Sequence, residues 1–214
     1  MDEEISIIDK KTRNEKIKIF LVKNKKLLIS ITIVIILLIL SIYSYKIYKD
    51  RHKEWLSDKY NSAIIAHEAD DKKKTISLMV QVVEDNDNTY SPLALYYLID
   101  NKLIEDSEEI NRLFDELINE TSFEKEIKNL IIYKKALYNA DFINENELLS
   151  ILKPIISEGS IWSSHALYLI AEYFYSQNEL QKSKEFFNQI LNTKNANEKI
   201  VKLAQKRLNR DLSD

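Results

Sequence analysis

The sequence predicts an all-α protein in which one membrane-spanning helix precedes a domain of paired helices. Three observations lead to this prediction. An uncharged apolar run lies near the N-terminus, apolar residues recur at three-to-four spacing along the rest of the chain, and the 214 residues include one glycine and two prolines. Glycine most readily supplies the positive φ angles of tight hairpin turns, so we expect hardly any position in this chain to adopt a positive φ. This disfavours β architecture and glycine-cradled nucleotide sites.

Residues 27–45 form an uncharged run of nineteen residues, thirteen of them Leu, Ile or Val. A helix of this length rises roughly 28 Å, close to the ~30 Å hydrocarbon core of a bilayer. The competing interpretation is a cleaved secretory signal, whose apolar region is about 7 to 15 residues long and ends at a small-residue cleavage site. The run here ends Ile42-Tyr43-Ser44-Tyr45-Lys46, without such a site. We therefore expect an uncleaved transmembrane helix that contacts the lipid bilayer through residues 27–45.

Lysine and arginine are unevenly distributed around this run. Residues 7–26 hold eight and residues 46–65 hold five. Because cytoplasmic flanks keep the positive excess, we expect a cytoplasmic tail over residues 1–26 and an outer domain over residues 46–214, although the basic residues after the run leave the opposite topology open. The chain has no cysteine, which excludes a lipoprotein anchor, disulfides and thiol chemistry.

The tail through residue 26 carries a net charge of +3, and the rest of the chain carries −6. An acidic outer domain argues against nucleic acid as a partner, since phosphate binding requires a positive surface. The three histidines, His52, His67 and His165, are scattered without metal-ligand spacing. We therefore expect no catalytic site, no metal, no cofactor and no small-molecule substrate.

Polar breaks divide the outer domain into helical segments. They lie at 70–72, 86–89, 101–107, 120–123, 140–146, 157–160, 177–178 and 193–197. Segments of about 12 to 18 residues with short breaks between them are typical of antiparallel helical hairpins. Ser107 and the pair Thr121-Ser122 are interpreted as helix starts, because Ser and Thr favour the N-cap position.

A repeated pattern identifies the kind of hairpin. Ser91-x-x-Ala94-Leu95-Tyr96-x-Leu98 recurs as Ser163-x-x-Ala166-Leu167-Tyr168-x-Ile170, a displacement of 72 residues or two units of 36. Paired helices with a period near 34 to 36 residues are the tetratricopeptide signature. The sequence thus predicts a tetratricopeptide-like α-solenoid of about four hairpins, with a degenerate middle unit at about 124–157 and a capping helix at about 196–212.

The last unit fits the tetratricopeptide consensus best. Its consensus positions are Leu167, Ile170, Ala171 and Phe174 on the first helix, and Ser183 and Phe187 on the second. We expect the small residues among them to lie where two helices approach closely and the aromatic residues to fill the space beside them.

Two short stretches add a resemblance to a known family. Asn88-Thr89-Tyr90 leads into a helix that carries Ala94, and Glu158-Gly159 with Trp162 precedes Ala166. Together with the basic tail, the single span and the divergent repeats, they resemble the ancillary Sec-translocon subunit family of bacterial membrane proteins. The resemblance implies a periplasmic domain on the inner membrane, with the Sec translocon and periplasmic chaperones as partners.

Stacked helical repeats generally bind partners in the concave groove formed by their first helices. By consensus position, we predict that the groove is lined by Tyr96, Asp100, His165, Tyr168, Glu172 and Tyr175. Tyrosine offers a large contact area and a hydrogen-bonding tip, which suits peptide binding. The alternative for each of these residues is ordinary packing between repeats.

These observations favour a non-enzymatic, membrane-anchored protein-interaction module that serves protein export or periplasmic folding. The same architecture would also suit an anchored scaffold for another envelope machine, such as cell division or cytochrome maturation. A second alternative is an enzyme, a hydrolase or transferase, whose active site the sequence does not reveal.

Overall fold

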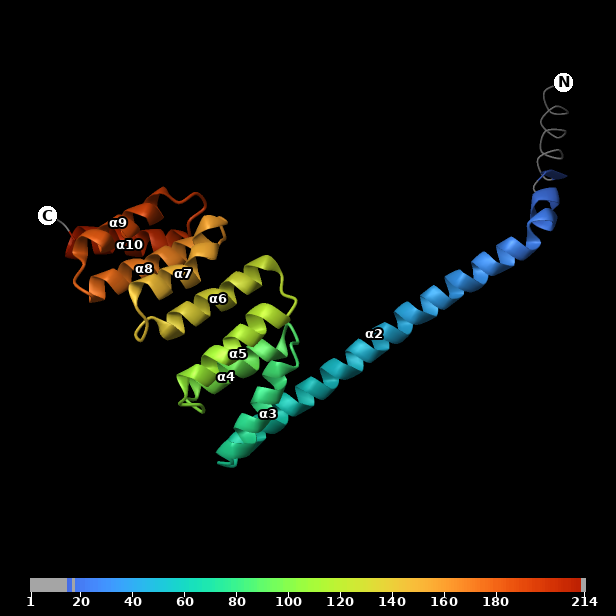
Figure 1. The fold of residues 1–214 in the computed structure, drawn as a ribbon, viewed down its shortest axis with the longest axis horizontal. Helices are drawn as coiled ribbons and strands as arrows, with labels where there is room; N and C mark the ends of the chain where they lie inside the picture. The colour runs from blue at the N-terminus through green and yellow to red at the C-terminus, as the bar shows by residue number, and fades with distance from the viewer. Residues whose placement is uncertain (1–14, 17, 213–214) are drawn as a thin grey trace, which may run out of the picture. The chain divides into compact units, whose positions relative to one another are not determined.

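The computed structural model describes residues 15–16 and 18–212, and the chain is all-α (Figure 1). It divides into two compact units, which meet between Trp55 and Leu56. The predicted cytoplasmic tail lies mostly outside the described residues, since residues 1–14 and 17 are not among them.

The first unit is dominated by α2 (Lys25–Glu68), a helix of 44 residues that continues into the second unit. It contains the whole predicted span, and none of the side chains in its most apolar window is buried. The hydroxyl of Thr32, inside this apolar stretch, donates to the Leu28 carbonyl at 2.9 Å, so its hydrogen bond is made within the helix. Among the described residues, α2 is the helix long and apolar enough to cross a bilayer. These properties are consistent with a single-pass membrane anchor.

From Leu56 on, the chain forms antiparallel helical hairpins that pack in sequential order (Figure 1). After α2 come α3 (Lys72–Glu84), α4 (Tyr90–Asp100), α5 (Ser107–Glu120), α6 (Lys125–Asn139), α7 (Glu145–Ser157), α8 (Ser163–Ser176), α9 (Leu180–Asn192) and α10 (Glu198–Asp211). All of these boundaries lie within two residues of the predicted polar breaks. The degenerate middle unit is the hairpin α6–α7, and the predicted last helix is α10.

The turns after the helices use asparagine and aspartate in place of glycine. Positive φ angles occur just after helix ends at Asp70, Asn86, Lys102, Gly159, Asn178 and Asn195. Asparagine and aspartate tolerate this left-handed conformation better than other side chains do, so they can terminate helices where glycine is scarce. The premise that hardly any position in this chain can adopt a positive φ was therefore wrong, although the all-α prediction drawn from it is confirmed.

Small hydroxyl residues join neighbouring helices, as expected at the consensus position Ser183. The buried Ser91 and Ser163, which open the two copies of the pattern, donate to the carbonyls of Val82 and Ile155 at 2.6 and 2.8 Å. Ser183 donates from α9 to the Ala171 carbonyl of α8 at 2.9 Å. Each bond ties one helix to the helix before it, so the two copies share a packing role as well as a sequence.

One predicted helix start is wrong. Thr121 is the C-cap of α5, and its hydroxyl donates to the Asn86 side chain at 2.9 Å. Helix α6 begins four residues later, after Glu124, without a side-chain cap. By contrast, Ser107 does open α5, with Asp106 as its N-cap. Thr121 is recruited by a residue 35 positions away, a contact that local capping preference does not reveal.

Three apolar clusters run along the stack. The first joins the end of α2 to α3, α4 and α5 around Phe114, the second joins α6, α7 and α8 around Phe174, and the third joins α8, α9 and α10 around Phe187. Helix α10 contributes the buried Ala204 to the third cluster. It thereby covers the apolar face that the final hairpin would otherwise expose, which is the role of a terminal cap in a repeat protein.

Candidate protein-binding surface

The six predicted groove residues lie on two helices, α4 and α8, each the first helix of a hairpin. The structure distributes them over three contacts between such helices. Tyr96 and Asp100 line a pocket together with residues of α5 and α6, His165 packs against α6, and Tyr168, Glu172 and Tyr175 meet α10. The structure therefore brings them together as three small groups.

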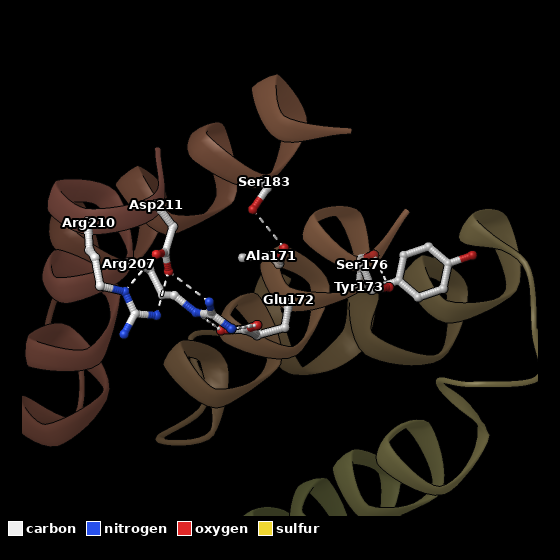
Figure 2. A network of polar contacts seen from close by, with 8 residues as sticks. All are labelled: Ala171, Glu172, Tyr173, Ser176, Ser183, Arg207, Arg210 and Asp211. Atoms are coloured by element: carbon white, nitrogen blue, oxygen red, sulfur yellow. Dashed lines mark hydrogen bonds and ion pairs between the residues drawn. The ribbon is translucent and has the colours of Figure 1, made fainter. Parts of the chain in front are cut away.

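Arg207 of α10 closes the contact between α8 and α10 (Figure 2). Its Nε and Nη2 donate to the two carboxylate oxygens of Glu172 at 2.7 and 2.5 Å, and its Nη1 donates to Asp211 at 2.8 Å. The hydrogen bonds that Arg207 donates to these carboxylates raise its pKa, and those that Asp211 accepts from Arg210 and Arg207 lower the pKa of Asp211. This two-point pairing of guanidinium with carboxylate fixes both direction and distance between the helices.

The same guanidinium organises two of the predicted groove tyrosines. Its central carbon lies 4.7 Å from the centre of the Tyr175 ring. Burial and the neighbouring Glu172 carboxylate raise the pKa of the Tyr168 hydroxyl, which also hydrogen-bonds Arg207. The Tyr168 ring packs edge-on against Phe187 of α9 at 5.4 Å. We name Tyr168, Glu172, Tyr175 and Arg207 the α8–α10 clasp; within this chain its residues already have partners.

His165 lies between rings. It packs on Tyr133 of α6 at 6.0 Å and on Trp162 at 5.1 Å, measured between ring centres. Its Nδ1 is buried without a hydrogen-bond partner among the described residues, and burial lowers the pKa of its imidazole. The Trp162 indole is held in turn by a hydrogen bond from its Nε1 to the Glu126 carbonyl at 3.0 Å. His165 is thus a packing residue in an aromatic contact between α6 and α8.

The contact between α4 and α6 differs, because it contains a pocket. This cavity of about 280 Å³ is lined by residues of three helices: Tyr96, Ile99 and Asp100 of α4, Phe114 of α5, and Lys134, Leu137 and Tyr138 of α6. The Lys134 ammonium lies 5.2 Å from the centre of the Tyr96 ring. We name this site the α4–α6 pocket.

Two polar groups of the pocket lack partners. The Tyr96 hydroxyl is buried and makes no hydrogen bond with the described residues, and burial raises its pKa to about 12. Asp100, the exposed last residue of α4, forms no ion pair with any described residue. In the clasp the equivalent positions, Tyr168 and Glu172, are both satisfied by Arg207. An empty volume beside a buried hydroxyl without a partner and an exposed carboxylate without an ion pair makes the α4–α6 pocket the strongest binding candidate among the six predicted residues.

Two cations decide these contacts, Lys134 and Arg207, and neither is among the predicted site residues. They follow Tyr96 and Tyr168 by 38 and 39 residues, so each arises from the next first helix in the stack. These two separations differ by one residue, and this regularity is visible in the sequence. It could have been found by asking which charged residue recurs at one repeat length after each predicted groove tyrosine.

Among the described residues, no group of three or more His, Asp or Glu side chains is arranged to hold a metal ion. The sequence matches no protein-family model, no curated protein and no solved structure. Function is therefore argued from the geometry above.

Proposed function

We propose that this protein is a non-enzymatic, membrane-anchored interaction module whose hairpins form a tetratricopeptide-like solenoid. The proposal rests mainly on helix α2. None of the side chains in its apolar window is buried, and its last turns pack on the stack of hairpins. Such a helix tethers the domain to a bilayer. The α4–α6 pocket supports a binding role for the domain, since it offers apolar walls and unpaired polar groups.

The proposed location is the bacterial inner membrane, with the N-terminus in the cytoplasm and the hairpins in the periplasm. The excess of lysine and arginine before residue 27 supports this orientation. Protease added to spheroplasts should then digest the hairpin domain and leave an N-terminal tag intact. Digestion of the domain only after lysis would mean that the chain is inserted the other way round.

The proposed partners are the Sec translocon and periplasmic chaperones, with the protein as an ancillary subunit of that channel. The two short stretches around Thr89 and Gly159 support this assignment through their resemblance to the family. Affinity purification of the full chain from native membranes in mild detergent, followed by identification of stoichiometric partners, tests it. Recovery of the channel would support the proposal, whereas recovery of a division or cytochrome-maturation complex would support the anchored-scaffold alternative.

A matched control separates the domain from the tether. In this control, residues 27–45 are replaced by an unrelated single-span sequence, which preserves anchoring and removes any sequence-specific contact within the bilayer. Partners that bind the hairpins should persist in this variant. If this variant loses every partner, the interaction lies in the span and a binding role for the solenoid is contradicted. If neither chain recovers a stoichiometric protein, the binding role is contradicted as well.

A further inference from the structure

We propose that the α4–α6 pocket binds one large apolar side chain of an extended polypeptide segment, and that Lys134 and Asp100 hold the adjoining peptide group. This inference rests on the proposed function, because it names the ligand of an interaction module. It concerns a feature of this chain that the repeat pattern alone does not specify.

The size of the cavity favours a single side chain. Its volume is about 280 Å³, whereas pockets for drug-sized molecules span roughly 300 to 1,000 Å³. Its apolar wall combines the buried Phe114 with Ile99, Tyr138 and the half-exposed Leu137. An apolar side chain that entered would remove its own surface and that of Leu137 from water, which is favourable.

The polar groups at the pocket match a peptide group. Lys134 supplies only hydrogen-bond donors and Asp100 only acceptors; both line the pocket, and no ion pair joins them among the described residues. A peptide group presents one carbonyl acceptor and one N–H donor. Asp100 is also the last residue of α4, where the helix dipole disfavours a carboxylate. A hydrogen bond donated by the ligand would therefore stabilise this carboxylate.

The same matching selects an extended segment. Inside a helix the peptide N–H and carbonyl bond to each other four residues apart and are not available to a partner. An extended chain presents both groups to the side. Because the two charges of the pocket have opposite sign, the site has no preference for an acidic or a basic ligand. The ligand class is therefore a neutral, unfolded, apolar stretch of polypeptide.

The α8–α10 clasp shows how a different cation changes the equivalent place. There Arg207 reaches Glu172 and the Tyr175 ring together, so one side chain of the protein satisfies both. In the pocket Lys134 lies over the Tyr96 ring and leaves Asp100 unpaired. The buried hydroxyl of Tyr96, which has no hydrogen-bond partner among the described residues, lies in the same wall.

Photo-cross-linking of the full chain in detergent micelles tests the inference. The probe is N-acetyl-Gly-photoleucine-Gly-amide, whose leucine analogue carries a diazirine, and mass spectrometry locates its attachment. We expect attachment at Leu137, Ile99 and Tyr138, and competition by N-acetyl-Gly-Phe-Gly-amide but not by its alanine counterpart. Attachment spread over exposed apolar residues elsewhere, without preference for the pocket, would overturn the proposal.

Leu137→Asp is expected to lower the cross-linking yield roughly tenfold, because a carboxylate in the wall must lose water when the apolar ligand enters. Leu203→Asp on α10 is the matched control, since the two leucines are 47% and 45% exposed, and it should leave the yield unchanged. Equal yields from the two variants would contradict the pocket. Melting curves of both variants, recorded by circular dichroism, establish that each is folded.

The hold on the peptide group is tested separately. Asp100→Ala and Lys134→Met should each weaken binding about threefold, a typical loss for one hydrogen bond. A probe whose N–H after the photoleucine is methylated should be insensitive to Asp100→Ala. If that probe binds as well as its parent, the peptide hold is wrong. Failure to recover a native partner would contradict the proposed function and leave these cross-links intact, so the two failures are distinguishable.

Discussion

The α4–α6 pocket and the α8–α10 clasp share two pairs of residues that lie 72 positions apart, Tyr96 with Tyr168 and Asp100 with Glu172, but a different cation completes each site. In the clasp, Arg207 bonds both oxygens of Glu172 and lies over the Tyr175 ring. In the pocket, Lys134 reaches the Tyr96 ring and leaves Asp100 without an ion pair. The planar guanidinium can bridge a carboxylate and a ring together, whereas an ammonium is a single point of charge.

A residue's position in the repeat consensus therefore does not determine whether it packs within the chain or remains available for binding. Tyr96 and Tyr168 hold the same place in the repeat, yet one hydroxyl is unpartnered and the other is hydrogen-bonded. The residue contributed by the next helix decides which outcome occurs. A groove inferred from the repeat alone therefore includes positions that the chain has already filled.

Deleting α10, by ending the chain at residue 197, should destabilise the clasp region more than any substitution considered below. The deletion uncovers Phe187 and Ala171 of the third apolar cluster and removes the buried Ala204 and Leu212. We expect a loss of roughly 3 to 5 kcal/mol, from the few large side chains that lose their cover, and a melting temperature lower by about 10 °C. Thermal unfolding followed by circular dichroism measures it. An unchanged melting temperature would show that α10 is not a cap.

Arg207→Ala and Lys134→Ala form the next pair. The Arg207 and Glu172 side chains are 25% and 26% exposed, so the loss should fall between the ~0.2–1 kcal/mol of surface pairs and the ~3–5 kcal/mol of broken buried pairs, at about 2 kcal/mol. Lys134→Ala should cost only about 0.5 to 1 kcal/mol, the range for an exposed cation–π contact such as the one that its ammonium makes with the Tyr96 ring. Chemical denaturation of the full chain measures both. Similar losses in the two variants would mean that the two contacts are equivalent after all.

Much of the architecture could be predicted because it depends on local pattern. The apolar run at 27–45, the polar breaks and the 72-residue recurrence are all visible along the chain, and the helices follow them closely. The position of Ser183 between α8 and α9 was likewise expected from its place in the consensus, since a small residue is what a close helix approach accommodates.

The partners of the candidate residues could not be predicted in the same way. Glu172 meets Arg207 from 35 positions away, and Asn111 and Asn139 exchange amide hydrogen bonds at 2.9 and 2.7 Å from 28 positions apart. Such contacts depend on how one helix crosses another, and a shift of one residue along a helix turns a side chain by 100° or so. The sequence placed the six residues on first helices but did not reveal which of them the protein itself covers.

Replacing each equivalent tyrosine by phenylalanine should give effects of opposite sign. Tyr96→Phe removes a buried hydroxyl that has no partner, so we expect a gain of up to about 1 kcal/mol. Tyr168→Phe removes a hydroxyl that hydrogen-bonds Glu172 and Arg207, so we expect a loss of about 1 kcal/mol. The ring packing is retained in both variants. Two losses of equal size would show that the Tyr96 hydroxyl is satisfied in solution and that the contacts do not differ there.

The smallest expected effect concerns His165, which lies at the α6–α8 contact between the two compared regions. Its neighbours there are the rings of Tyr133 and Trp162, and burial lowers the pKa of its imidazole below the ordinary value of 6.5. In the pH range between the folded and the unfolded pKa, the unfolded chain binds more protons than the folded chain. Stability should therefore fall as the pH is lowered through about 6.5 and level off once the folded imidazole is protonated.

The measurement is the free energy of unfolding of the full chain at pH 8.0, 7.0, 6.0 and 5.5, compared with that of His165→Gln. At pH 8 the imidazole is neutral in both states, so any difference between the chains there reports packing against Trp162 and not protonation. The wild-type chain should lose more stability than the variant between pH 7 and pH 5.5, a window that lies above the pH at which the depressed pKa values of Glu109 and Asp211 begin to matter. Parallel pH dependences in the two chains would mean that His165 can be protonated in place and that this contact is more open to water than the clasp beside it.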